Sequence, residues 1–272
     1  EAGRDTAPAL LARAHPLFLR ANQEQTKKLV AALGKLDVDW HEGKNPSRPQ
    51  IRTTLTADHA GQAVEAGKKL TLTLEATNTG KRPLVRVRAV SKSPLRAFDG
   101  LDFVLGRLPP GETRRWKVTV DVPRSTTSQY VPIEARFHVG GRDEFMDGLA
   151  AKAFVEVQGL PRPRFAYTAV VDDRDAGNGD GIAQPGEKVD LRVRLTNVGT
   201  GAAMSTLAVI KNRGGDEVFI KDGRDRLKGL AVGASADLRF TVNVRDSLPD
   251  SGLQLDLKVT DTVLHQHMVH HL

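Results

Sequence analysis

The residues with the clearest potential for site chemistry lie in one acidic segment, 172–187, which reads Asp-Asp-Arg-Asp-Ala-Gly-Asn-Gly-Asp-Gly-Ile-Ala-Gln-Pro-Gly-Glu. Calcium takes about six to eight oxygen ligands, which a compact loop supplies from carboxylates, amides and carbonyls at alternating positions. The EF-hand spacing is incomplete here, because its first ligand position falls on Ala176, which has no side-chain oxygen. With a neighbouring Asp in that place, the segment predicts a Ca²⁺ site formed by Asp173, Asp175, Asn178, Asp180, Glu187 and the backbone carbonyl of Ile182.

A plain turn between two strands is the alternative interpretation of the same segment. Glycines supply positive φ in such turns, and Asp side chains cap backbone N–H groups. The corresponding segment in the first half of the chain, residues 58–65, lacks most of these acidic residues. A metal site is therefore expected once at most, and both interpretations stay open.

The tail from His265 to His271 holds four of the eight histidines and is a second candidate for metal binding. On a strand, His265 and His267 would share a face and could bind zinc or nickel. A solvated chain end is the favoured interpretation, because only Asp261 lies close in sequence as an acidic ligand.

Sequence patterns of the common catalytic centres are missing. The chain has no Gly-x-Ser-x-Gly elbow, no His-Glu-x-x-His, no Walker loop and no Gly-x-Gly-x-x-Gly at a strand-to-helix turn. We therefore predict that these 272 residues are not themselves an enzyme.

The elements that must position these residues belong to a pattern that occurs twice. Residues 66–80 match residues 185–199 at a displacement of 119 positions, and residues 106–122 match residues 228–244 at a displacement of 122. Two colinear matches at nearly one displacement predict a duplicated domain of about 110–120 residues.

Alternating apolar side chains define strands in both copies. Leu70, Leu72 and Leu74 share one face in the first copy, as do the apolar residues of 189–195 in the second. Such strands, separated by Gly, Pro and Asn turns, predict a mainly β fold with two tandem Ig-like antiparallel β-sandwiches. We place the sandwiches at residues 51–158 and 165–272, with residues 159–164 as a short, stiff, proline-rich connector.

A short helical region precedes the sandwiches, at residues 1–40. Ala and Leu predict a helix over residues 7–14, which Pro16 should end or kink, and a second helix from Pro16 to Leu33. Gly34 is expected to stop the second helix. We expect this region to be the end of an upstream domain, followed by a linker at residues 41–50.

Bulk composition limits the function classes. The hydrophobic fraction of 39% and the charged fraction of 27% indicate a folded soluble protein, and no apolar run reaches the length of a membrane span. The net charge of +7 is spread along the strands, and only 5% of residues are aromatic, so we predict no nucleic-acid partner. There is no cysteine, so no disulfide framework is expected.

Several sequence runs resemble known modules. Residues 178–187 with Leu195-Thr196-Asn197-Val198-Gly199 resemble the CARDB-like and related Ig-like modules of exported bacterial proteins. The order of parts is similar to the C-terminal region of certain large tail-specific (carboxyl-terminal processing) serine peptidases of proteobacteria. The runs that carry this resemblance are Val38-Asp39-Trp40, Phe98-Asp99-Gly100, residues 103–113 and residues 159–167.

The resemblance implies an accessory region of a peptidase that is periplasmic or otherwise exported to the bacterial envelope, rather than its catalytic part. The Ser/Lys dyad and the PDZ domain of that family would lie upstream of Glu1, and no segment here matches them. The chain starts without an initiator Met, so we expect that a longer precursor has been cut or divided. An upstream peptidase domain or another protein is the expected partner, and the oligomeric state is left open.

The leading functional hypothesis is therefore non-catalytic binding and scaffolding that positions a substrate or partner. One alternative is a structural or interaction subunit of a bacterial surface or envelope assembly, in which edge strands pair between subunits. Another is carbohydrate or polyanion binding through a basic face, which salt would weaken.

Overall fold

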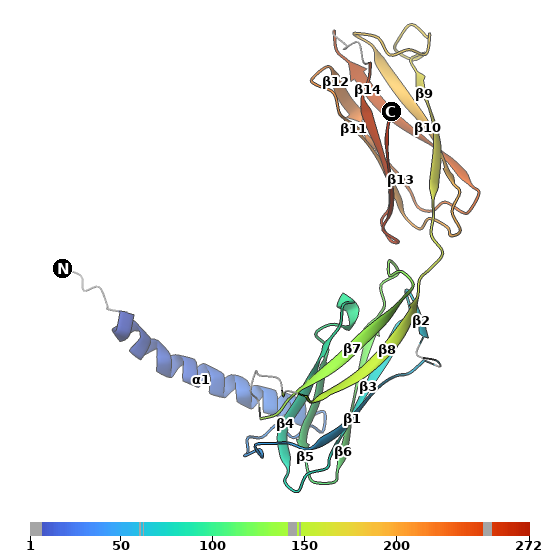
Figure 1. The fold of residues 1–272 in the computed structure, drawn as a ribbon. Coiled ribbons are helices and arrows are strands. Elements are labelled where there is room, and N and C mark those ends of the chain that lie inside the picture. The colour runs from blue at the N-terminus through green and yellow to red at the C-terminus, as the bar shows by residue number, and fades with distance from the viewer. Residues whose placement is uncertain (1–6, 60, 62, 141–145, 147, 247–251) are drawn as a thin grey trace, which may run out of the picture. The chain divides into compact units, whose positions relative to one another are not determined.

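The structure is a computed structural model that describes residues 7–59, 61, 63–140, 146, 148–246 and 252–272, with side chains from residue 19 onward. The chain forms two compact units. The first comprises residues 1–64, 69–122 and 130–156, and the second comprises residues 65–68, 123–129 and 157–272. Each unit contains one antiparallel β-sandwich (Figure 1), as the alternating sequence pattern predicts.

The first sandwich consists of a three-stranded sheet, β1-β3-β6, and a five-stranded sheet, β2-β8-β7-β4-β5. Its core includes Leu70, Leu72 and Leu74, all fully buried, together with Phe103 and Phe137. The elements of this half are α1 (Ala7–Gly34), β1 (Ile51–Ala57), β2 (Ala63–Glu65), β3 (Lys69–Asn78), β4 (Leu84–Lys92), a 3-10 turn (Arg96–Phe98), β5 (Asp102–Leu108), β6 (Thr113–Asp121), β7 (Gln129–His138) and β8 (Ala150–Gln158).

The second sandwich pairs two four-stranded sheets, β12-β14-β10-β9 and β13-β11-β15-β16. Leu195, Phe240 and Leu257 lie at the centre of its core. The strands are β9 (Phe165–Asp172), β10 (Lys188–Asn197), β11 (Thr206–Asn212), β12 (Val218–Asp222), β13 (Arg224–Leu227), β14 (Ser235–Val244), β15 (Leu255–Asp261) and β16 (Gln266–His271).

The expected pair of helices is in fact one. Helix α1 runs without a break from Ala7 to Gly34, so the prediction that Pro16 separates two helices was wrong. Proline removes a single intrahelical hydrogen bond, and the Ala- and Leu-rich sequence on both sides favours continued helix. The helix does end at Gly34, as predicted.

A buried asparagine stands at the same place in both sandwiches. Asn78 ends β3 and donates from Nδ2 to the carbonyls of Arg82 (2.8 Å) and Leu108 (2.9 Å). Asn197 ends β10 and donates to the carbonyls of Gly201 (2.9 Å) and Leu230 (3.0 Å). In each copy the amide oxygen accepts the N–H of the glycine two residues later. The sequence repeat is thus also a repeat of one hydrogen-bond pattern.

Cross-strand pairs on the outer faces repeat as well. The hydroxyls of Thr77 and Thr113 are 2.7 Å apart between β3 and β6, and those of Thr196 and Ser235 are 2.8 Å apart between β10 and β14. At the next cross-strand pair on the same face of the sheet, Glu75 on β3 forms an ion pair with Arg115 on β6 (2.6 Å) in the first copy. The second copy has the same ion pair with reversed polarity, from Arg194 to Asp237 (3.3 Å).

Residues 38–45 follow the helix and form an anchoring segment on the first sandwich. Val38 and Trp40 are buried, and the carbonyl of Asp39 accepts the N–H of Arg107 at 2.8 Å. Asn45 pairs with the backbone of Val85 through both its amide oxygen (2.8 Å) and its amide nitrogen (3.3 Å). Part of the predicted linker at 41–50 is therefore held to β4, although it has no helix or strand of its own.

Arg86 and Gly106 shape the receiving surface for this segment. Arg86 adopts a φ of 51° at a bulge in β4, and its guanidinium donates to the carbonyl of Trp40 (3.0 Å) and pairs with Glu42 (3.1 Å). Gly106 has a φ of 72°, and a Cβ there would lie 2.7 Å from the carbonyl oxygen of Asp39. Both positions use left-handed backbone, which a β-strand rarely contains, so the strand edge is adapted to the segment beside it.

Replacing the buried asparagine should destabilise either sandwich strongly. Asn197→Ala removes the amide that donates to the carbonyls of Gly201 and Leu230 and accepts the N–H of Gly199, and we expect a loss of about 2–4 kcal/mol in the free energy of unfolding. Asn212 is the matched control, because its amide makes the same kinds of bond, to the carbonyls of Gly215 (2.7 Å) and Val218 (3.1 Å), at a half-buried position. Urea unfolding of Asn197→Ala and Asn212→Ala measures the difference; equal losses would contradict a special role of the buried site.

Candidate functional site

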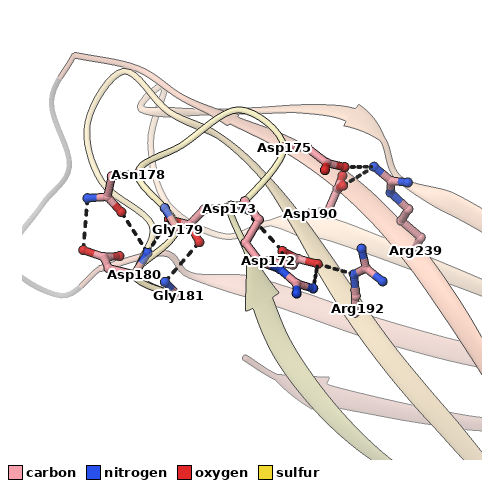
Figure 2. Close-up of polar contacts among 11 residues, drawn as sticks. Asp172, Asp173, Asp175, Asn178, Gly179, Asp180, Gly181, Asp190, Arg192 and Arg239 are labelled. Carbon is pink, nitrogen blue, oxygen red and sulfur yellow. Dashed lines mark hydrogen bonds and ion pairs between the residues drawn. The ribbon is translucent and has the colours of Figure 1, made fainter.

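The acidic segment forms the loop between β9 and β10, and Asp173 organises it (Figure 2). This side chain is only 1% exposed. Its carboxylate accepts three backbone N–H groups, from Gly179 (2.8 Å), Asp180 (3.1 Å) and Gly181 (3.0 Å). Burial opposes ionisation of Asp173, but these N–H groups outweigh it, so the pKa of the carboxyl lies below its ordinary value. Positive φ at Gly179 (83°) and Gly181 (80°) lets the backbone curl around the carboxylate.

A second set of bonds closes the exposed side of the loop. Glu187 accepts the N–H groups of Asn178 (3.2 Å) and Gln184 (3.0 Å). Asp180 accepts the N–H of Ile182 (2.8 Å) and the side-chain amides of Asn178 (3.1 Å) and Gln184 (2.7 Å). The oxygens predicted as metal ligands therefore act as acceptors for the loop's own N–H groups.

Below the loop, two buried aspartates and two arginines form a charged array on the outer face of the sheet. Asp172 on β9 and Asp190 on β10 are direct cross-strand partners, as are Arg192 on β10 and Arg239 on β14. Arg192 pairs with Asp172 at 2.5 Å, and Arg239 pairs with Asp190 (Figure 2). Like charges lie directly opposite each other, and each is compensated by an opposite charge at the diagonal position on the neighbouring strand.

The pKa values of the two aspartates reflect this environment. Hydrogen bonds from the guanidinium of Arg174 (2.8 and 2.9 Å), with the charge of Arg192, hold the pKa of Asp172 far below its ordinary range. Burial opposes ionisation of Asp190, but Arg239 and Thr241 donate to it, and its pKa is also lowered. Both carboxylates are therefore ionised at neutral pH, and they hold the loop to the sheet.

The predicted ligands are only partly brought together. Asp173, Asn178, Asp180 and Glu187 belong to one hydrogen-bonded network, in which Ile182 takes part through its N–H. Asp175 instead turns away and pairs with Arg239 at 3.3 Å (Figure 2). Across the described residues, no three His, Asp or Glu side chains are placed to hold a metal ion.

Calcium does not fit this arrangement unless side chains move. Asp175 would have to leave Arg239, and Asp173 would have to share oxygens that already accept three N–H groups. The observed geometry is that of the plain-turn interpretation, and calcium binding by this loop stays a prediction.

Sequence reasoning did not single out the charged array. Asp172, Asp190, Arg192 and Arg239 occur where charged residues are common on a solvated strand face. The sequence does contain one indication of the array. Residues alternate with a period of two along β10, and this alternation places Asp190 and Arg192 together on the polar face of the strand. Their partners lie on other strands, and only the register connects them.

The histidine tail differs from the sequence expectation. His265 lies in the turn before β16 with a φ of 54°, so it does not share a strand face with His267. His271 contacts Asp256 at 2.6 Å on the neighbouring strand β15. The ring of His270 meets that of Tyr167 edge-on, with 5.1 Å between centroids. The described tail is thus part of a sheet edge.

Comparison with known proteins identifies an accessory domain. Residues 64–138 match the family described as NPCBM-associated, NEW3 domain of alpha-galactosidase. The matched region covers β3 to β7 of the first sandwich, and it indicates a β-rich, non-catalytic accessory domain. No curated protein matches the chain.

Solved structures add little. A protein of unknown function from Porphyromonas gingivalis W83 is 14% identical with a TM-score of 0.30, covering 81% of this chain and 98% of its own. Red sea bream transglutaminase is 12% identical with a TM-score of 0.29, covering 84% of this chain and 31% of its own. Such low scores support no argument about fold or function. Among the described residues, no helix is long and apolar enough to cross a membrane.

The hydrogen bonds of Asp173 lead to a prediction about calcium. Asp173→Ala removes acceptors from three backbone N–H groups, so it should lower the melting temperature by several degrees in excess calcium and equally in chelator. Asp175→Ala, at an exposed position, should change little in either condition. Thermal unfolding followed by circular dichroism measures both variants. A loss confined to calcium, or a clear rise of the wild-type melting temperature with calcium, would instead support the metal site.

The lowered pKa values predict acid sensitivity. Asp172, Asp173 and Asp190 titrate below the unfolded value of about 3.8, so they stabilise the fold above that pH and lose this contribution as pH falls through their folded values. The melting temperature should therefore fall steeply below about pH 4. Asp190→Asn should be less stable than wild type at pH 7, and this difference should shrink as the pH falls through the lowered pKa of Asp190.

The exposed Asp237, which also pairs with an arginine, provides the control for this pH series. Asp237→Asn should follow the wild-type profile throughout. Parallel profiles for Asp190→Asn and the wild type would show that the buried carboxylate is not the source of the acid sensitivity.

Proposed function

We propose that this chain is the non-catalytic binding region of an exported tail-specific serine peptidase, in which it positions a substrate or partner. The match of residues 64–138 to an accessory domain found with an enzyme carries the proposal. The runs that resemble the C-terminal part of such peptidases, from Val38-Asp39-Trp40 to residues 159–167, favour a peptidase as the enzyme. The chain lacks catalytic motifs, in agreement with an accessory role.

Helix α1 supports attachment to a further domain. Leu19 and Leu29 of the helix are 46% and 47% exposed, and Leu36 in the turn after it is 61% exposed, so apolar side chains remain in water along the described part of the helix and just beyond its end. Burying a leucine fully is worth about 1.5–3 kcal/mol. We propose that these side chains pack on the peptidase domain, and that the anchoring segment 38–45 transmits the position of that domain to the first sandwich.

A second candidate is an accessory region of a glycoside hydrolase. The description of the matched family names alpha-galactosidase, which favours this alternative for the enzyme but leaves the accessory role unchanged. A subunit of an envelope assembly is less favoured, because the accessory-domain match describes a module that accompanies an enzyme. An exported, periplasmic location follows from the peptidase proposal.

A labelled unfolded polypeptide tests the proposal. We expect fluorescein-labelled carboxymethylated α-lactalbumin to show raised anisotropy with the 272-residue chain and to remain uncleaved after long incubation. Folded α-lactalbumin, with its disulfides intact, is the control and should not bind. Cleavage that a single point substitution abolishes would contradict the non-catalytic role. Absence of binding would contradict the positioning of polypeptide substrates.

A further inference from the structure

Two exposed aromatic side chains stand on the outer face of the five-stranded sheet of the first sandwich. Tyr130 on β7 is 74% exposed and Phe154 on β8 is 62% exposed. Their sequence neighbours Val131, Ala153 and Val155 are buried, so both rings occupy outward positions of their strands. Rings of this size are usually buried, and exposed ones that gather on one face indicate a binding surface.

The strand register places the two rings near each other. Strands β7 and β8 are neighbours in the sheet. Phe137 donates its N–H to the carbonyl of Leu149, and Glu134 pairs with Lys152, so the strands run antiparallel. We count two residues from the Glu134–Lys152 pair, forward along β8 to Phe154 and backward along β7 to the exposed Pro132. In this register Phe154 lies opposite Pro132, and Tyr130 is the diagonal neighbour of Phe154. Diagonal positions on one face are about 7–8 Å apart.

We propose that Tyr130 and Phe154 form a stacking platform for a flat, neutral, β-1,4-linked glycan chain. The inference goes beyond the proposed positioning of a polypeptide and is independent of which enzyme the chain serves. Both rings protrude from the sheet into solvent. A protruding ring can stack against the flat C–H face of a pyranose, whereas the side chain of a protein partner would need a pocket to insert into. Two rings contribute at most about 300–500 Å², whereas a stable protein interface needs about 800 Å² on each partner.

The charges beside the rings favour a neutral ligand. Arg136 donates to the carboxylate of Glu134 at 2.9 and 3.1 Å, and Lys152 pairs with the same carboxylate at 3.9 Å. Lys92, opposite Glu134 on β4, pairs with Asp99 at 3.6 Å. Each of these cations has an acidic partner, and two of them share Glu134, so this face has no strong field for a polyanion, but its side chains offer donors and acceptors to sugar hydroxyls.

Titration calorimetry with cellohexaose and chitohexaose tests this assignment. We expect binding of at least one of these β-linked probes and none of maltohexaose, whose α-linked chain is curved. Tyr130→Ala and Phe154→Ala should each weaken binding about tenfold or more, and the double variant should abolish it. Phe219→Ala is the matched control, because Phe219 is 54% exposed on β12 of the second sandwich, and it should bind as the wild type does. All four variants should melt near the wild-type temperature.

The same variants separate this inference from the proposed function. Loss of hexaose binding in the double variant, with carboxymethylated α-lactalbumin still bound, supports the glycan platform. Loss of polypeptide binding together with no hexaose binding by the wild type would assign the rings to a protein partner and overturn the inference. Wild-type protein that binds polypeptide but none of the hexaoses would also overturn it, while the proposed function would stand.

Discussion

The buried amide of Asn78, and of Asn197 in the second copy, is the interaction on which each sandwich depends. One side chain joins the end of a strand to the loop that follows and to the distant carbonyl of Leu108 or Leu230. Only an amide of this length supplies two donors and an acceptor at once; aspartate has no donor and leucine has neither. Because an unpaired amide in the core would be costly, all its partners must be in place, which fixes the loop and the register together.

Around this constraint the two copies have diverged in charge while they kept their pairing. The ion pair Glu75–Arg115 has become Arg194–Asp237, with acid and base exchanged between the strands. An exposed cross-strand pair contributes little and depends on opposite charge rather than on which strand carries it. The polarity was therefore free to change, and the geometry of the strands was not. In the second copy, the next positions along are Arg192 and Arg239, whose charges are compensated by Asp172 on β9, by Asp190 on β10 and by Asp175 in the adjoining loop.

Sequence reasoning predicted what depends on local pattern. The alternation in residues 70–74 and 189–195 predicted buried strands because one face of each strand must exclude water. It could not predict that Asp172 meets Asp190, because that contact depends on the register between separate strands. It misjudged Pro16, because the surrounding helix propensity outweighs the loss of one hydrogen bond. Sequence reasoning also missed the short strands β12 and β13 and the role of Arg86. A bulge and an arginine with left-handed backbone produce no periodic pattern in the sequence.

The polar groups of the acidic loop and the aromatic groups of the first sandwich differ in what remains available to a ligand. In the loop, Asp173, Asp180 and Glu187 each accept N–H donors from the loop itself, so a ligand must compete with bonds already made. The rings of Tyr130 and Phe154 are in water, and a ligand displaces only solvent from them. Acidic residues attracted attention in the sequence because carboxylates suit metals. In the structure those carboxylates accept the hydrogen bonds that hold the loop together. The exposed aromatic face contains Tyr130, which lies within the residues that match the accessory-domain family, and among the described residues its rings make no such competing bonds.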